Sequence, residues 1–433
     1  MQENNGKRRE IQFAALRFQR HCVAATNAKS KNGKKQMTTA RRTTRKFRVG
    51  NAYIGGDAPV LIQTMTATKT TDVSATAASV KTLAEAGAGL VRVAVDSPND
   101  AKALAEIRRL TLGVANISVD LQENFRLAEA VAPYVDKIRY NPGHLGRLEP
   151  ELSWQKKVEF LVETARANDC ALRVGVNCGS VDPVKLARYK ELVAQNGGAA
   201  PEGETVFAPL LESALEHVDF LDSLNFDRYC VSIKDSDPET VVLANRRFAE
   251  LRPQIPLHLG VTEAGAPPRG VLKSRLALET LLSEGIGETL RVSLTVEANR
   301  KTEEIEAGRA ILANVAAGTV VDPATKLPAL NVVSCPSCSR VQNGRFVELA
   351  RRLEAAAEFA RDYPLKIATM GCRVNGPGET DDADVGLWCG ADRVNLKSGG
   401  ELVGAFGYDE IVDKALELLR EKIREYDAKH AQN

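Results

Sequence analysis

Short apolar runs rich in β-branched residues alternate with amphipathic segments between residues 62 and 295. Eight of these runs have the length and composition of buried strands: 62–66, 90–95, 115–121, 137–141, 172–177, 228–234, 257–263 and 290–295. Helical periodicity occurs between them, as in 75–86, 98–110, 153–168, 208–221 and 273–284. Eight strands that alternate with helices over about 250 residues are typical of a (β/α)8 TIM-type barrel.

An open doubly wound sheet has the same alternation, but it usually carries a glycine-rich turn after its first strand. No such turn follows the run at 62–66. We therefore expect an α/β protein whose N-terminal part is a TIM-type barrel.

The alternation ends in a proline-containing stretch at 322–330, which we interpret as a linker. A second, smaller α/β domain is predicted beyond it. Its strands are expected at 331–333, 365–370, 384–388 and 393–396, and its helices at 345–361 and 409–426. The predicted organisation is a basic leader (1–40), a barrel (41–325) and a C-terminal domain (330–433).

The bulk composition excludes several classes of protein. The 433 residues are 44% hydrophobic and 26% charged, as in ordinary globular proteins, and a net charge of +2 favours neither nucleic acid nor a membrane as partner. No apolar run reaches the roughly 18 residues of a membrane span. The leader lacks the apolar stretch of a secretory signal. Three interpretations of the leader stay open. It is a flexible tail, an organelle transit peptide, or a stretch that is not translated because the true start is Met37.

Basic and amide side chains interrupt the apolar strands of the expected barrel. They are Arg92, Arg139, Asn141, Arg173, Asn177, Lys234, Arg291 and Ser293. Because active sites of TIM barrels lie at the carboxyl ends of the strands, and because buried charge needs compensation, these residues predict an anionic ligand. Guanidinium groups match phosphate oxygens, so a di- or polyphosphate is expected.

Other polar residues near the strand ends have more open interpretations. Asp96, Asp120 and Glu263 could orient the basic groups or handle protons. His258 is either a core histidine or a substrate contact.

A metal site is predicted in the C-terminal domain. Cys335 and Cys338 form a Cys-x-x-Cys turn, and Cys372 follows in a distant loop. Three such thiolates can hold zinc or an iron–sulfur cluster. Composition favours Cys389 as fourth ligand, whereas Glu379 would offer a carboxylate that leaves iron more readily.

The other cysteines are expected to be inert thiols: Cys22, Cys170, Cys178 and Cys230. Eight cysteines are too sparse for a disulfide scaffold, and their clustering fits a metal protein of the reducing cytoplasm.

From about residue 41 to about residue 427, the chain resembles the 4-hydroxy-3-methylbut-2-enyl diphosphate synthase family of the methylerythritol phosphate isoprenoid pathway. The residues that carry the resemblance occur in six motifs, at 139–143, 173–177, 258–265, 283–287, 335–340 and 375–379. The resemblance implies reductive ring opening and dehydration of 2-C-methyl-D-erythritol 2,4-cyclodiphosphate. Two electrons would enter through a [4Fe–4S] cluster from a flavodoxin or ferredoxin.

The resemblance also implies roles for individual residues. The cluster ligands would be Cys335, Cys338, Cys372 and Glu379, which replaces the preference for Cys389. Glu263 would assist proton transfer or hold a substrate hydroxyl. The substrate-binding set would be Arg92, Arg139, Arg173, Asn177, Lys234, His258, Arg291 and Ser293. Members of the two-domain bacterial type are homodimers in which the cluster domain of one subunit caps the barrel of the other.

One stretch departs from the family pattern. Many members carry Asp-Ile-His-Phe after the third strand, where this chain has Asp120-Leu121-Gln122-Glu123-Asn124-Phe125. Whether Gln122 or Glu123 replaces the histidine stays open.

Two other hypotheses have no redox role. One is a phosphate-binding barrel of the pteroate-synthase type with a structural zinc module, and the other is a zinc-ribbon protein whose basic tail contacts RNA. Both predict zinc in place of iron.

Overall fold

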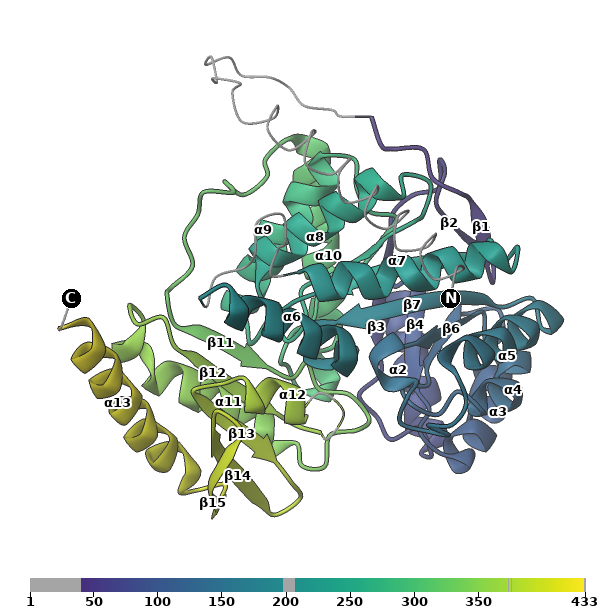
Figure 1. The fold of residues 1–433 in the computed structure, drawn as a ribbon. Helices are drawn as coiled ribbons and strands as arrows, with labels where there is room; N and C mark the ends of the chain where they lie inside the picture. The colour runs from purple at the N-terminus through teal and green to yellow at the C-terminus, as the bar shows by residue number, and fades with distance from the viewer. Residues whose placement is uncertain (1–39, 198–206, 373, 375, 432–433) are drawn as a thin grey trace, which may run out of the picture.

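The computed structural model describes residues 40–197, 207–372, 374 and 376–431. The predicted leader up to residue 39, which includes Cys22, lies outside the described residues, as does Asn375 of the last motif. A barrel domain and a smaller C-terminal domain lie side by side (Figure 1).

Eight parallel strands form the barrel, as the sequence predicted. They are β3 (Leu61–Met65), β4 (Leu90–Ala94), β5 (Ile117–Asp120), β6 (Lys137–Tyr140), β7 (Ala171–Asn177), β8 (Tyr229–Lys234), β9 (His258–Leu259) and β10 (Thr289–Leu290). Hydrogen bonding runs from β8 through β7, β6, β5, β4, β3 and β10 to β9. A bridge between Val231 and Leu257 joins the two ends and closes the barrel.

The last two strands are much shorter than the predicted runs at 257–263 and 290–295. Beyond these strands the chain contacts the C-terminal domain: Ala264 forms a bridge with Ser334, and Thr295 Oγ1 donates to the carbonyls of Ser334 and Cys335. Local sequence gives no signal for such a contact, since the partner lies far along the chain.

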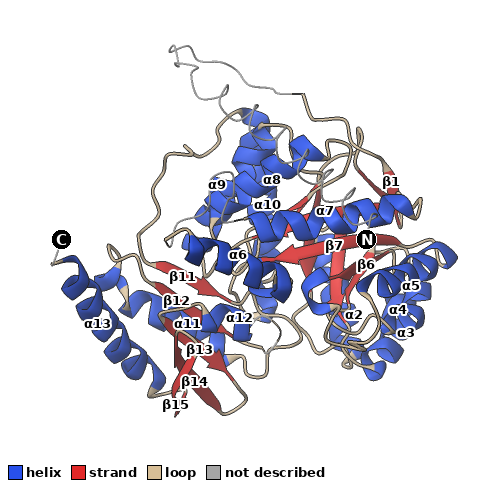
Figure 2. Ribbon diagram, viewed as in Figure 1, coloured by secondary structure: helices blue, strands red, loops and turns tan. Residues whose placement is uncertain are grey.

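Helices surround the strands (Figure 2). They are α2 (Val73–Glu85), α3 (Pro98–Thr111), α4 (Leu127–Val131), α5 (Trp154–Ala167), α6 (Pro183–Gln195), α7 (Ala208–Ser223), α8 (Pro238–Leu251), α9 (Arg269–Ser283) and α10 (Thr302–Ala317). Side-chain caps fix several helix starts. Ser97, for example, forms a capping box with Asp100 ahead of α3. Helices α4, α6, α8 and α10 were not among the named helical segments.

A β-hairpin covers the amino-terminal end of the barrel. Its strands β1 (Phe47–Val49) and β2 (Ala52–Ile54) place Phe47, Val49 and Ile54 in one apolar cluster with Leu90 and Ala171, the first residues of β4 and β7. The carboxyl ends of the strands are therefore the end available for a site.

The C-terminal domain is built on a mixed sheet with the order β11 (Asn331–Ser334), β12 (Lys366–Met370), β13 (Val385–Cys389), β14 (Arg393–Ser398) and β15 (Glu401–Gly407). The first three strands are parallel and the last two add antiparallel. Helices α11 (Arg345–Ala356) and α13 (Ile411–His430) pack on it, and the short α12 (Gly376–Asp381) follows the Cys372 loop. This confirms the predicted α/β class and adds β15 and α12.

The connection between the two domains, residues 318–330, contains neither helix nor strand. Among the described helices, none is both long enough and apolar enough to cross a membrane.

Candidate active site and cluster site

A cavity of about 100 Å³ lies between the carboxyl ends of the barrel strands and the C-terminal domain. Most of the predicted site residues line it: Arg92, Arg139, Arg173, Asn177, Lys234, Glu263, Arg291, Ser293, Cys335, Cys338 and Cys372. Predicted anion-binding and metal-binding residues thus face one space. His258 and Glu379 are not among its lining residues.

The arginines of the cavity are held by different partners. Arg139 Nη1 lies 2.8 Å from Asp120 Oδ1, and its Nη2 donates to the Gly175 carbonyl at 2.8 Å. Arg92 contacts the sulfur of Met65, with Nε at 3.3 Å. Arg173 is only 2% exposed, yet its Nε and Nη1 have no hydrogen-bond partner among the described residues. Such unsatisfied buried donors are costly and indicate a place for a ligand's acceptor atoms.

Arg291 is positioned by a carboxylate that the sequence analysis did not name. Glu304 of α10 accepts from Arg291 Nε and Nη2, each at 3.3 Å. It also accepts from Lys301 Nζ at 2.8 Å and from Thr64 Oγ1 at 2.9 Å. The sequence alone does not indicate a role for Glu304, because its contacts with Arg291 and Lys301 arise only when the chain is folded.

Positive charge dominates the barrel wall of the cavity. Burial, with Arg139 next in effect, lowers the pKa of Arg173 to about 10. Burial and the neighbouring arginines also hold the pKa of Lys234 well below its usual value, and burial lowers that of Arg92 in the same direction although Asp120 opposes it. A bound anion would relieve this repulsion. The charge of this wall therefore favours an anion, such as phosphate, as its ligand.

His258 lies buried close to these cations rather than in the cavity. Its Nδ1 is 2.6 Å from Thr289 Oγ1, and burial together with Lys234 holds its pKa well below the usual value. It is a neutral imidazole of the interior in this structure, and its predicted substrate contact stays a prediction.

The three cysteines face the barrel from the C-terminal domain. Cys335 follows β11, Cys338 lies three residues on, and Cys372 follows β12. Contact with Cys372 and burial raise the pKa of Cys338, and contact with Cys335 raises that of Cys372 to about 12, so Cys372 lies against both of the other thiols. Among the described residues, no three Cys, His, Asp or Glu side chains are arranged to hold a single metal ion. Three adjacent thiols at a cavity wall fit the sulfur ligands of an iron–sulfur cluster.

Neither candidate for the fourth ligand lines the cavity. Cys389 is 2% exposed in the apolar core of the C-terminal domain. Glu379 is also 2% exposed, and it pairs with Lys366 at 3.1 Å and accepts from Cys178 Sγ at 3.4 Å. Lys366 is the first residue of β12, whereas Cys372 follows the last. In this arrangement the carboxylate is held at the start of β12, and its role as fourth ligand stays a prediction.

The departure from the family pattern falls on the cavity wall. Gln122 lines the cavity, with a φ of 49° and a side chain fixed at both ends. Its Nε2 donates to Asp120 Oδ2 at 2.8 Å, and its Oε1 lies 2.8 Å from His144 Nδ1. Glu123 instead points toward Arg147, where its side chain is 44% exposed. Of the two residues, Gln122 lines this cavity and Glu123 does not, and the question which of them replaces the family's histidine stays open.

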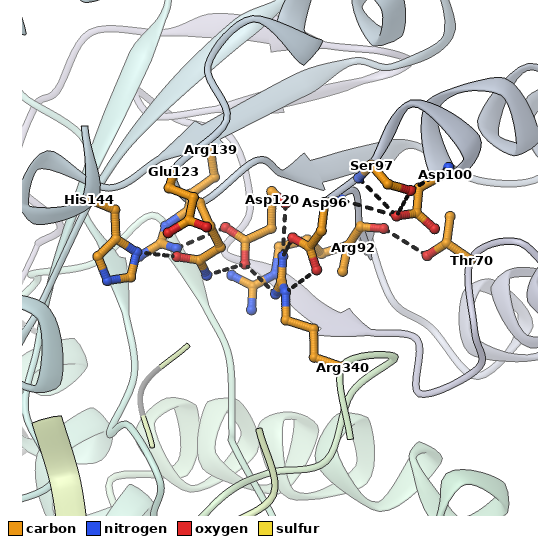
Figure 3. A network of polar contacts seen from close by, with 12 residues as sticks. Thr70, Arg92, Asp96, Ser97, Asp100, Asp120, Glu123, Arg139, His144 and Arg340 are labelled. Carbon is orange, nitrogen blue, oxygen red and sulfur yellow. Dashed lines mark hydrogen bonds and ion pairs between the residues drawn. The ribbon is translucent and has the colours of Figure 1, made fainter. Parts of the chain in front are cut away.

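His144 stays neutral beside Gln122. Burial, with Arg147 next in effect, lowers the pKa of His144 to about 3, so Nδ1–H donates to the amide oxygen. His144, Arg139 and Asp120 belong to one network of polar contacts (Figure 3). Gln122 links His144 to Asp120, and Asp120 pairs with Arg139.

The barrel holds the Cys335–Cys338 loop through its backbone. Thr295 donates to the carbonyls of residues 334 and 335, and Lys301 donates to that of Pro336. Lys69 Nζ donates to the carbonyls of residues 339 and 341 at 2.7 and 2.8 Å. The loop therefore has a defined position over the anion-binding wall.

Comparison with known proteins agrees with both halves of the site. Residues 44–309 match the GcpE TIM-barrel domain, and residues 331–421 match the GcpE protein C-terminal domain. A 4-hydroxy-3-methylbut-2-en-1-yl diphosphate synthase (flavodoxin) of Rhodopirellula baltica is 54% identical over 379 residues, which is 87% of this chain and 96% of that protein. A protein of the same name from Acinetobacter baylyi is 37% identical over 390 residues, or 89% of this chain and 95% of that one. The chain belongs to the GcpE family.

Proposed function

We propose that the chain catalyses the reaction named in its relatives, the formation of 4-hydroxy-3-methylbut-2-en-1-yl diphosphate. The substrate is 2-C-methyl-D-erythritol 2,4-cyclodiphosphate, which takes up two electrons and two protons, opens its ring and loses water. The observation that carries this proposal is the shared cavity, where a cationic barrel wall faces three cysteines. A diphosphate and an electron-transfer group can meet there.

The barrel, residues 41–325, binds the diphosphate. Arg92, Arg139, Arg173, Lys234 and Arg291 supply positive charge, and Asn177 and Ser293 supply hydrogen bonds. Because the cations are already in place before the ligand arrives, little reorganisation is needed to bind it.

Glu263 is the proposed acid for proton transfer. It lines the cavity and is 1% exposed. Its backbone carbonyl accepts from the amide of Ser334, and Cys335 is the next residue. The acid is thereby fixed relative to the cysteine loop.

The C-terminal domain, residues 330–433, holds the cofactor. Cys335, Cys338 and Cys372 would bind a [4Fe–4S] cluster, which delivers electrons when present. Glu379 is the family's expected fourth ligand, and it reaches that place only by leaving Lys366. A flavodoxin or ferredoxin would supply the electrons, and the thiolate ligands favour the reducing cytoplasm.

The chain is also proposed to act as a homodimer with exchanged domains. In the structure the cysteine loop contacts the barrel of its own chain, through Thr295, Lys301 and Lys69. The connection at 318–330 has no regular structure, so the same contacts can form between two chains. Co-expressed Arg173→Leu and Cys335→Ser chains test this: exchange restores turnover at limiting substrate, whereas capping within each chain leaves the mixture no faster than the Arg173→Leu chain alone.

Turnover by anaerobically purified protein tests the activity. With a chemical reductant or reduced flavodoxin, the cyclodiphosphate should disappear as the linear allylic diphosphate forms. Iron and sulfide should be present in the same sample. Zinc without iron, or no consumption of the cyclodiphosphate by iron-loaded protein, would contradict the proposal.

A further inference from the structure

Arg340, two residues beyond Cys338, crosses from the C-terminal domain to the barrel (Figure 3). Its Nε and Nη2 each lie 2.7 Å from one carboxylate oxygen of Asp96. Its Nη1 is 3.2 Å from Asp120 Oδ2, and Nη2 also donates to the Asp120 carbonyl at 3.1 Å. The Arg340 side chain is 7% exposed; its partner Asp120 is buried as well, whereas the Asp96 side chain is 39% exposed.

Asp120 joins this arginine to the anion-binding wall. One of its oxygens pairs with Arg139 at 2.8 Å, and the other accepts from Arg340 and from Gln122. Burial opposes ionisation of Asp120, but Arg139, Arg92 and Arg340 together hold its pKa well below the usual value. The ionised carboxylate of Asp120 thus contacts Arg139, which is predicted to bind the diphosphate, and Arg340, which follows the loop with Cys335 and Cys338.

Arg340 also stands at the boundary of two cavities. It lines the inner cavity and a neighbouring one of about 560 Å³, and Gln122 and Cys372 share this position. If its guanidinium moved, the distance between the cysteine loop and the barrel would change. The boundary between the two cavities would change with it.

We propose that Arg340 is a positioning residue, which sets the Cys335–Cys338 loop at a fixed height over the anion site through Asp96 and Asp120. This inference rests on the proposed function. Bidentate pairing with a carboxylate fixes direction as well as distance, which a lysine cannot reproduce. Since small displacements of reacting groups cost large factors in rate, the loss of this pairing should appear in kcat.

Three variants test the proposal: Arg340→Gln, Arg340→Lys and, as a matched control, Arg345→Gln. Arg345 lies in the same domain, its guanidinium pairs with Asp409 and lies over the Tyr408 ring, and its side chain is 54% exposed. We expect Arg340→Gln to lower kcat by about tenfold or more. Its iron content and the spectrum of its reduced cluster without substrate should equal those of the unaltered protein. Arg340→Lys should recover part of the rate, and Arg345→Gln should not differ from the unaltered protein.

Asp96→Asn extends the test as a double-mutant cycle. If Asp96 acts through Arg340, it should slow the reaction alone but add little to Arg340→Gln. Full additivity, an unchanged kcat in Arg340→Gln, or a rate loss matched by iron loss would overturn the positioning role.

Hydrogen exchange separates this inference from the proposed function. Amides of residues 334–341 should exchange faster in Arg340→Gln than in Arg345→Gln, whether or not the protein turns over the cyclodiphosphate. Equal exchange in the two variants would overturn the inference, whereas failed turnover by the unaltered protein would overturn only the function.

Discussion

Glu379 and Lys366 form an ion pair with 3.1 Å between Oε2 and Nζ, although the family resemblance assigns Glu379 to the cluster. The carboxylate is buried, and Lys366 has a second partner in Asp382 at 3.0 Å. Lys366 therefore competes with the cluster for Glu379 in the arrangement described.

The choice of fourth ligand predicts opposite behaviour of two variants. We expect Glu379→Ala to lose turnover, because the carboxylate is the proposed ligand. Cys389→Ser should keep both iron and turnover, since its side chain lies in the apolar core and not at the cavity. Iron content and steady-state rates measure both effects. The reverse pattern would favour an all-thiolate site.

Arg173→Leu should separate binding from stability. Buried guanidinium donors without partners are costly, so their removal should leave the free energy of unfolding unchanged or higher. Affinity for the cyclodiphosphate should fall about 10- to 100-fold, as expected for lost charged hydrogen bonds, without loss of iron. Calorimetric titration and thermal unfolding check the two statements.

The matched control is Arg109→Leu, since Arg109 is exposed on α3 and pairs with Glu106. It should bind substrate normally. Unchanged affinity in Arg173→Leu would refute the anion-binding assignment.

Glu304→Ala should destabilise the barrel. Its removal leaves Arg291 and Lys301 buried without their shared carboxylate, and breaking a buried pair in this way costs about 3–5 kcal/mol. Glu303→Ala, the neighbouring variant, removes only a partly exposed pair with Arg300 and should cost about 0–1 kcal/mol. Denaturant unfolding under anaerobic conditions compares them, and similar losses would contradict the role given to Glu304.

His144 should make the protein sensitive to mild acid. Because burial lowers its pKa from 6.5 to about 3, the unfolded chain takes up a proton below pH 6.5 that the folded chain does not. Stability is therefore unaffected by His144 above pH 6.5 and falls as pH drops below it. At pH 5.5 the loss should be about 1 kcal/mol.

His144→Gln should remove that part of the acid sensitivity, because an amide does not take up a proton in this pH range. The amide can still donate a hydrogen bond to Gln122, so the contact is kept. The measurement is the free energy of unfolding at pH 7.5 and pH 5.5. His430→Gln, at an exposed position in α13, should keep the full dependence. An identical pH dependence in His144→Gln and the unaltered protein would contradict this account.

The sequence predicted the barrel well because strand and helix periodicity is local. Each of the eight apolar runs contains or overlaps a strand of the barrel, and Arg92, Arg139 and Arg173 come together because parallel strands end at one edge. The pairing of Cys335 and Cys338 as metal ligands could also be predicted, because a Cys-x-x-Cys turn is a local pattern.

Contacts between distant segments could not be predicted in this way. Glu304 supports Arg291 from a later helix, and Arg340 reaches Asp120 across the domain boundary. The pairing of Glu379 with Lys366 is also a tertiary contact, and the spacing of the two residues along the chain does not predict it. Each depends on how completed elements pack, which local pattern does not specify.

We expect the cluster thiols and the barrel arginines to serve one reduction in one cavity. The most direct test of this expectation is an anaerobic reductive titration of iron-loaded protein with the cyclodiphosphate present. We expect one linear diphosphate to form for every two electrons consumed, with none formed by Cys335→Ser and much less formed by Arg173→Leu at limiting substrate. Electrons consumed while the cyclodiphosphate stays intact, or product formed by the cluster-free variant, would contradict it.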